Sequence, residues 1–198
     1  LIVDTNSNYS DVWNPCFARL DKYASKIKKY VFTDTKKDVP KNYTPIIYDN
    51  SASYRNQLLS CLKQVKEKYI IYTSEDYILY DFVQLDKIEE ISKFLDETDY
   101  SFCKFIRGPE KTHNLDNNLF VIDSNDPNFF AQQASIWKTK DFQKVFETAP
   151  AENTRMQHEP GGSKICQQLG FTGLQYFSNT SKRGLHHYDS EIYPCIAT

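Results

Sequence analysis

The chain has 198 residues, a formal net charge of −2 and a sequence pI of about 6.1. This length suits one domain with a sizeable hydrophobic core, and the near-neutral charge argues against a nucleic-acid-binding surface. No apolar run approaches the roughly 20 residues of a membrane-spanning helix, and no signal-peptide pattern opens the sequence.

These features predict a cytoplasmic protein. Its five cysteines are odd in number and scattered, without Cys-x-x-Cys spacing, so we expect small buried thiols in a reducing compartment rather than disulfides. Leu1 already belongs to a predicted strand, and the chain ends at Thr198 without a terminating signal. We therefore expect these residues to be one domain of a longer protein.

Short apolar strands alternate with amphipathic helices through the first half of the chain. The predicted strands are 1–4, 27–33, 44–48 and 69–73. Helices are predicted to start at Asn14, to run over 53–66, and to lie between 85 and 95, because apolar residues recur there at intervals of three and four. This alternation predicts an α/β fold with a nucleotide-type amino-terminal half.

Regularity weakens in the second half. The expected elements are a half-exposed strand at 101–107, a loop at 114–118, a strand at 119–122, a returning strand at 129–137, a helix with Thr139 as N-cap, and a helix over 158–169. The tail after Tyr176 has no hydrophobic period. It is rich in side chains that bind phosphates or metals, namely Lys182, Arg183, His186, His187 and Asp189.

The stretch from Tyr69 to Asp76 combines a buried strand with two adjacent carboxylates. Residues 69–73 are β-branched or aromatic and are typical of an interior strand of a parallel sheet. Glu75 and Asp76 follow at its carboxyl end, where open α/β sheets bind their ligands. With Ser74 beside them they suit Mg²⁺ or Mn²⁺, which would neutralise a bound diphosphate.

Glycine-rich phosphate loops are missing. The loop after the first strand begins Thr5-Asn6-Ser7 and matches no dinucleotide fingerprint, and there is no Gly-Lys-Ser/Thr motif. A dinucleotide-dependent dehydrogenase and a P-loop enzyme are therefore disfavoured. A fold that binds a nucleotide diphosphate without glycines must neutralise it with a cation.

The order of these motifs resembles the nucleotide-sugar glycosyltransferases of the GT-A fold. The motifs are Thr5-Asn6 after the first strand, Arg55-Asn56 at the start of the helix before the central strand, Glu75-Asp76-Tyr77 after that strand, Trp137 before a short helix, and Glu159 near the start of a later helix. The chain is also similar in size to the amino-terminal domain of large-virus enzymes that glycosylate capsid proteins, for which the host cytoplasm is expected.

The resemblance implies a GT-A-like fold, a Rossmann-type mixed sheet flanked by helices in a single domain. Residues 1–107 would form a nucleotide-binding half and residues 108–198 an acceptor half. Thr5 and Asn6 would line the base, and Asp34 would contact the base or ribose.

The resemblance also implies roles at the diphosphate. Arg55 would touch the base or the diphosphate, and Asp76 would bind the Mn²⁺ or Mg²⁺ ion that bridges the two phosphates. Glu75 would assist Asp76 or hold the donor sugar. The Asp-x-Asp motif usual in the family stands here as Ser74-Glu75-Asp76, so the first of its carboxylates is missing.

Transfer to a hydroxyl with inversion requires a general base on the acceptor side. Glu159 is the first candidate and Asp189 the second. Lys182 and Arg183 could stabilise the leaving diphosphate, and the segment 182–188 could close over it as a lid.

The predicted function is transfer of a sugar from a nucleotide-diphosphate donor, expected to be a UDP-sugar, to a hydroxyl of a glycan or glycoprotein. Two alternatives stay open. One is a sugar-1-phosphate nucleotidyltransferase, although such enzymes usually need a Gly-rich basic loop that Thr5 to Asp11 lacks. The other is a non-catalytic carbohydrate-binding domain, in which Glu75-Asp76 would be an ordinary polar turn.

Overall fold

The computed structural model describes residues 1–116, 118–151, 155–177, 187–188 and 190–198, with side chains for all of these except 155–160. The α-helices are α1 (Trp13–Tyr23), α2 (Tyr54–Leu62), α3 (Leu85–Glu97), α4 (Thr139–Thr148) and α5 (Arg155–Gln168), and a short 3-10 helix, η1, spans Ser7–Tyr9. The strands are β1 (Ile2–Asp4), β2 (Tyr30–Thr33), β3 (Thr44–Ile47), β4 (Tyr69–Ser74), β5 (Tyr77–Leu79), β6 (Tyr100–Lys104), β7 (Thr112–Asp116), β8 (Leu119–Ile122), β9 (Ser135–Lys138), β10 (Thr172–Tyr176), β11 (His187–Tyr188) and β12 (Cys195–Ala197).

A nine-stranded mixed sheet forms the centre of the molecule, in the order β3-β2-β1-β4-β9-β6-β10-β8-β7. The strands β3, β2, β1 and β4 pair in parallel. The strand β9 is antiparallel to both β4 and β6, and β10 is parallel to β6. It follows that β1, β2, β3, β4, β6 and β10 all end at one edge of the sheet, called here the carboxyl edge.

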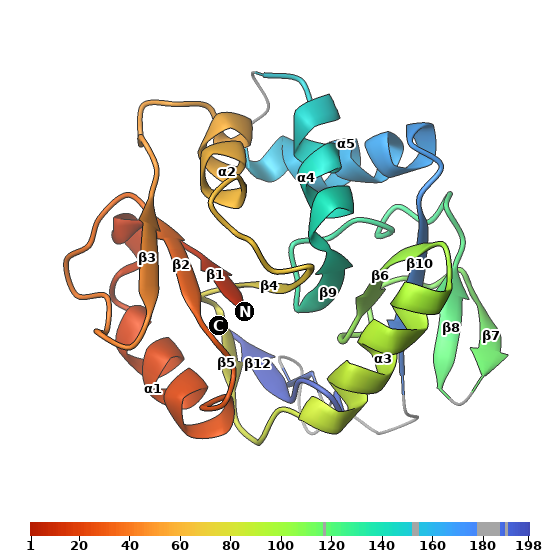
Figure 1. Cartoon of the computed structure of the whole chain (residues 1–198), viewed down its shortest axis with the longest axis horizontal. Coiled ribbons are helices and arrows are strands. Elements are labelled where there is room, and N and C mark those ends of the chain that lie inside the picture. Colours follow the sequence, from red (N-terminus) through yellow and green to blue (C-terminus); the bar gives the residue numbers. More distant parts are fainter. Residues whose placement is uncertain (117, 152–154, 178–186, 189) are drawn as a thin grey trace.

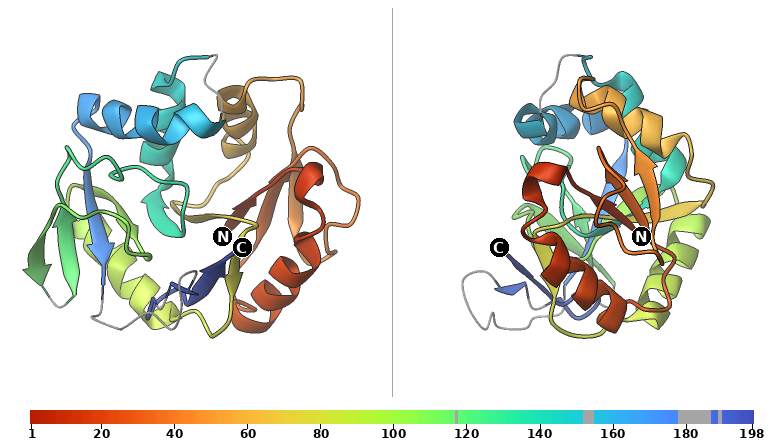
Figure 2. Two further views of the ribbon diagram at one scale, coloured as in Figure 1. Left: turned by 180° about the vertical axis from the view of Figure 1, so that it is seen from behind. Right: turned by 90° about the vertical axis from the view of Figure 1, so that its left-hand side faces the viewer.

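Helices cover both faces of this sheet. Figure 1 shows α2, α4 and α5 on one side and α1 and α3 on the other, and Figure 2 shows the same layers from behind. Each layer has its own apolar cluster: Trp13, Phe17 and Ile91 pack on the α1 and α3 side, and Leu58 and Phe142 pack on the other. The predicted α/β fold, with a mixed sheet flanked by helices, is confirmed.

A second, three-stranded sheet has the order β11-β12-β5 and lies between α1 and α3 (Figure 1). Its strands β5 and β12 are 116 positions apart at Leu79 and Cys195, which are paired residues. The sequence did not predict this sheet, because short strands distant in the chain carry no local pattern that links them.

Several predictions for the second half were wrong in whole or in part. The expected loop at 114–118 is largely the edge strand β7, whose exposed side chains need no apolar pattern. The expected half-exposed strand at 101–107 is β6, which is almost wholly buried because β9 and β10 flank it and both apolar clusters cover it. Thr139 is not an N-cap, since Lys138 holds that position and the Thr139 hydroxyl donates to the Glu67 carbonyl at 2.7 Å.

The prediction of buried thiols without disulfides is confirmed, since all five cysteines are unpaired and buried. Among the described helices, none combines the length and the apolar character that a membrane crossing requires.

Candidate functional site

The loop that follows β1 connects the ends of the neighbouring strands at the carboxyl edge. The Ser7 backbone N–H and hydroxyl donate to the two carboxylate oxygens of Asp34, after β2, at 2.7 and 2.6 Å. The Asn6 amide donates to the Tyr48 hydroxyl at 3.2 Å and to the Asn50 side-chain oxygen at 3.0 Å, both just after β3. The loop thus lies against the residues that follow β2 and β3, and it places Asn6 and Asp34 at the same edge of the sheet.

Thr5 is held inside this loop. Its side chain is fully buried, and its hydroxyl accepts a hydrogen bond from the Trp13 indole N–H at 2.8 Å. Its carbonyl accepts from the Tyr48 hydroxyl at 2.7 Å. These contacts give Thr5 a clear structural role, and its contact with a base stays a prediction.

The pKa of Asp34 reflects the loop around it. Burial acts to raise this pKa, but hydrogen bonds from the Ser7 hydroxyl, the Ser7 and Asp34 backbone N–H groups and the Thr33 hydroxyl outweigh burial and lower it. A carboxyl with a depressed pKa in the folded state adds stability above its unfolded-state pKa, and that contribution disappears as the pH falls through the folded-state pKa.

We expect Ser7→Ala to raise the pKa of Asp34 and to cost about 1 kcal/mol of stability at neutral pH, since one hydrogen bond to a partly buried carboxylate is lost. The difference from the wild type should shrink as the pH falls through the folded-state pKa of Asp34. An NMR titration of the Asp34 carboxyl and urea denaturation at several pH values would test this. Ser10→Ala, at an exposed position of the same loop, is the control; an unchanged Asp34 pKa in Ser7→Ala would contradict the expectation.

Asp4, the last residue of β1, is a buried acid that the sequence analysis did not single out. Its side chain is 2% exposed, and its Oδ2 atom accepts hydrogen bonds from the hydroxyls of Tyr54 at 2.9 Å and Tyr72 at 2.6 Å. These bonds fix the start of α2 against the ends of β1 and β4. The signal was present as an acidic residue ending an apolar strand, but its two tyrosine partners are 50 and 68 positions away.

Arg55, in the first turn of α2, contacts the end of α4. Its Nε atom donates to the Phe146 carbonyl at 2.9 Å and a terminal nitrogen donates to the Glu147 carbonyl at 3.0 Å. Carbonyls in the last turn of a helix lack intrahelical partners and carry partial negative charge, so a guanidinium is favourable there. The base or diphosphate contact expected for Arg55 stays a prediction.

Glu75 and Asp76 form the turn between β4 and β5. Glu75 is 5% exposed, whereas Asp76 is half-buried. The Ser74 hydroxyl donates to Oδ1 of Asp76, and the Asp76 carbonyl accepts from the Thr198 backbone N–H at 3.1 Å. The turn is therefore anchored to both sheets, at the end of the strand next to β1.

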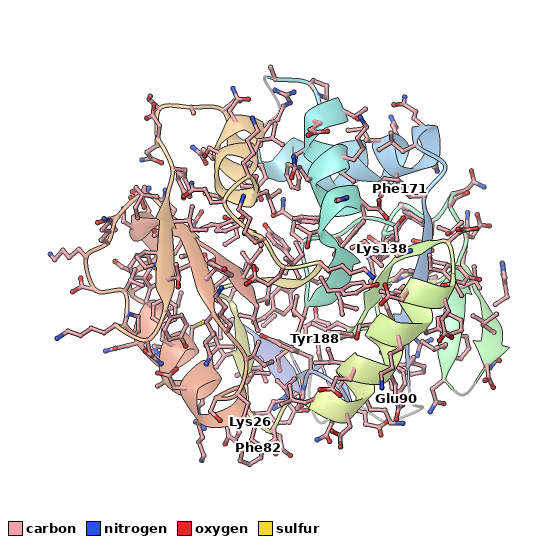
Figure 3. All side chains as sticks on the ribbon, viewed as in Figure 1. Lys26, Phe82, Glu90, Lys138, Phe171 and Tyr188 are labelled. Carbon is pink, nitrogen blue, oxygen red and sulfur yellow. The ribbon has the colours of Figure 1, made fainter. Side chains whose placement is uncertain are left out.

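An aromatic pair adjoins this turn, and the charges of the turn act on a buried thiol. The rings of Tyr77 and Tyr188 lie with centroids 6.0 Å apart, and Tyr188 is labelled in Figure 3. Burial, and then the negative charges of Glu75 and Asp76, raise the pKa of Cys16 to about 12. The Cys16 thiol therefore stays protonated at neutral pH.

The donor set at the turn suits a hard divalent cation that is shared with a ligand. Among the described residues no three His, Cys, Asp or Glu side chains are grouped to hold a metal by themselves. Mg²⁺, however, commonly binds through one or two carboxylates together with substrate phosphates. Asp76 fits this mode, because Ser74 orients its Oδ1 atom while Oδ2 accepts no hydrogen bond from the described residues.

The two acceptor-side carboxylates are not placed by the structure. Glu159 lies in α5, but its side chain is outside the described part of the chain. Asp189, Lys182, Arg183 and His186 are also outside the described residues. Their expected roles stay predictions.

No protein-family model matches the sequence, and no curated protein sequence matches it. Solved structures share its fold. Staphylococcus aureus TarS (residues 1–349) in complex with UDP superposes with a TM-score of 0.57 at 12% identity, over 91% of this chain and 58% of that one. The mannosyltransferase PcManGT from Pyrobaculum calidifontis, in complex with GDP-Man and Mn²⁺, gives 0.53 at 11%, over 93% and 57%.

A CMP:2-keto-3-deoxy-manno-octonic acid synthetase complexed with CTP gives a TM-score of 0.55 at 11% identity, over 93% of this chain and 91% of that one. The present chain thus spans less than three-fifths of TarS and PcManGT. At these identities the likeness shows the fold, and the predicted GT-A-like fold class is confirmed.

Proposed function

We propose that this chain is a glycosyltransferase domain that moves a sugar from a nucleotide-diphosphate donor, with UDP as the expected nucleotide, to a hydroxyl of a glycan or glycoprotein. The observation that carries the proposal is the arrangement at the carboxyl edge. The loop bonded to Asp34 follows β1, and the turn with Asp76 follows the adjacent strand β4. A nucleoside at the first and a diphosphate at the second would lie side by side.

The neighbours of the same fold support this proposal to different degrees. TarS was solved with UDP, and PcManGT with GDP-Man and Mn²⁺. The synthetase of the same fold was solved with CTP, so nucleotidyl transfer is the alternative function. The loop after β1 weighs against nucleotidyl transfer, because residues 5–11 contain no glycine and no basic residue to hold a triphosphate.

Glycosyl transfer requires one set of groups at the leaving diphosphate and another at the attacking hydroxyl of the acceptor. The bond between the sugar C1 and the diphosphate oxygen breaks, and a bond from C1 to the acceptor oxygen forms. A divalent cation would supply charge neutralisation at the leaving diphosphate. In this proposal Asp76 binds the cation at the diphosphate, and Asn6 and Asp34 bind the nucleoside. Glu159 or Asp189 is the general base that takes the proton from the attacking hydroxyl.

The direct test is a thermal-shift titration with UDP, GDP and their sugar conjugates, each with and without Mn²⁺. A ligand that binds only the folded state at about 100 times its Kd adds about 2.7 kcal/mol of stability. For a chain of this size this corresponds to a rise in Tm of roughly 5–10 °C. We expect that rise with a UDP conjugate, and a smaller one when Mn²⁺ is replaced by EDTA.

Other outcomes of this titration would redirect the proposal. Stabilisation by CTP or UTP in preference to nucleotide sugars would favour nucleotidyl transfer. The absence of a shift with every nucleotide would contradict the transferase proposal and favour a binding domain.

A further inference from the structure

A cavity of about 290 Å³ opens at the carboxyl edge, on the far side of β9 from Asp76. Its walls come from the segment after β6, from the carboxyl end of β10, and from the start of β8, which runs antiparallel to β10 and therefore begins at this edge. The lining residues that matter are Arg107, Glu110, Phe120, Gln175 and Phe177. Figures 1 and 2 show β6, β10 and β8 side by side, away from α1 and α2.

Arg107 lines this cavity. The guanidinium carbon lies 4.5 Å from the centroid of the Phe177 ring, a cation–π contact. Within the described residues, Arg107 forms no hydrogen bond and no ion pair. This contact therefore holds the guanidinium in place, and its N–H groups have no acceptor among the described residues. Such a fork matches the two oxygens of a carboxylate or a phosphate.

Gln175 adds a second donor to the same cavity. Its side chain is 3% exposed, and its Oε1 atom accepts a hydrogen bond from the Gly108 backbone N–H at 3.4 Å. Because that N–H can only donate, the oxygen of the amide must face Gly108 and the NH₂ must face elsewhere. This NH₂ has no acceptor among the described residues, so a ligand in the cavity that carries an oxygen acceptor would satisfy it.

Glu110 and Phe120 give the cavity a carboxylate acceptor and an apolar wall. The Glu110 side chain is exposed and is the one carboxylate among the lining residues. It would accept a hydrogen bond from a sugar hydroxyl. The half-buried ring of Phe120 offers an apolar wall for the C–H face of a sugar.

We propose that this cavity, between Arg107, Gln175 and Phe120, binds a sugar unit that carries a carboxylate or a phosphate. The anion lies against Arg107 and Gln175, and a hydroxyl of the sugar donates to Glu110. The inference rests on the proposed function in one respect, namely that the bound acidic sugar is part of the acceptor. The strands β4 and β10 are three positions apart in the sheet, about 14 Å, so the acidic unit is a different one from the unit that receives the sugar.

The test is an NMR titration of the ¹⁵N-labelled 198-residue chain with glucuronate, glucose 6-phosphate and glucose, without nucleotide and again with UDP. At least one acid is expected to bind ten times more tightly than glucose, with shifts at the Gly108 amide and the Gln175 side-chain NH₂. The two acids distinguish a carboxylate from a phosphate as the recognised group. Equal binding of glucose and both acids, or shifts confined to other residues, would overturn the proposal.

Arg107→Gln removes the charge at an exposed position and is expected to weaken binding of the preferred acid at least tenfold. Arg19→Gln is the matched control, because Arg19 also stacks on an aromatic ring, that of Tyr23 at 5.9 Å, on the surface of α1. It should bind the acid as the wild type does. If Arg107→Gln bound the acid with unchanged affinity, or if both variants lost the same affinity, the proposal would be contradicted.

The same variants separate this inference from the proposed function. Arg107→Gln should keep the full Tm rise with UDP conjugates. Binding of the acidic sugar without any nucleotide binding would support the cavity and contradict glycosyl transfer. Nucleotide binding without preference for the acidic sugars would leave the transferase proposal standing and overturn the cavity.

Discussion

Replacing Asp76 by asparagine is expected to lower sugar transfer by at least about a hundredfold while the protein stays folded. A carboxylate that holds a metal against a leaving diphosphate contributes several kcal/mol to stabilising the transition state, and about 1.4 kcal/mol corresponds to a factor of ten in rate. Asparagine keeps a side-chain oxygen for the hydrogen bond that Ser74 donates. The loss should therefore concern the charge of Asp76 and not the shape of the turn.

The measurements are the transfer rate with the donor identified by thermal shift, and that shift itself with and without Mn²⁺. In Asp76→Asn the part of the shift that depends on Mn²⁺ should disappear. Asp81→Asn is the control, since Asp81 is an exposed carboxylate nearby that accepts from the Phe82 N–H at 2.8 Å. If Asp76→Asn transferred sugar at the wild-type rate, the Asp76 carboxylate would have no role in the reaction.

Trp137→Ala is expected to destabilise the protein by about 3–5 kcal/mol, the usual cost of truncating a large buried aromatic. Trp137 is 1% exposed, and its ring stacks on Phe102 with centroids 4.1 Å apart. Its indole N–H donates to the Ser135 hydroxyl at 3.0 Å. Gly173 makes room for this stack, because a Cβ atom there would lie 2.1 Å from the Phe102 ring.

Urea denaturation would measure this loss, which for a domain of ordinary stability is a large part of the total. Trp137→Phe is the matched variant. It keeps an aromatic ring on Phe102 and loses the hydrogen bond and some volume, so we expect a clearly smaller cost. If Trp137→Ala were as stable as the wild type, the ring would not be the centre of this cluster.

The positions of three candidate residues could be predicted because they follow strands of the sheet, whereas their roles stay predictions. Asn6, Asp34 and Asp76 could be located because a polar residue after a short apolar strand of a parallel sheet must lie at the carboxyl edge. Arg55 was expected near the crevice by the same reasoning, but that reasoning locates a backbone position and not the direction of a long side chain. In the structure its guanidinium contacts the end of α4.

The residues that were missed depend on partners far along the chain. Asp4 gains its importance from Tyr54 and Tyr72. The cavity at Arg107 requires Gln175 and Phe177, about 70 positions later, to lie beside the end of β6. No local period carries such information.

By itself the sequence determined the α/β class, the alternation of strands and helices in residues 1–107, and the acidic turn after the central strand. Burial imposes periods of two and about 3.6 residues on neighbouring positions, and these can be read without a partner. Only the tertiary structure decided the edge strand β7, the pairing of β5 with β12, and the side chains that meet at the carboxyl edge. These depend on contacts between distant segments, whose free energy appears only when the whole sheet has formed.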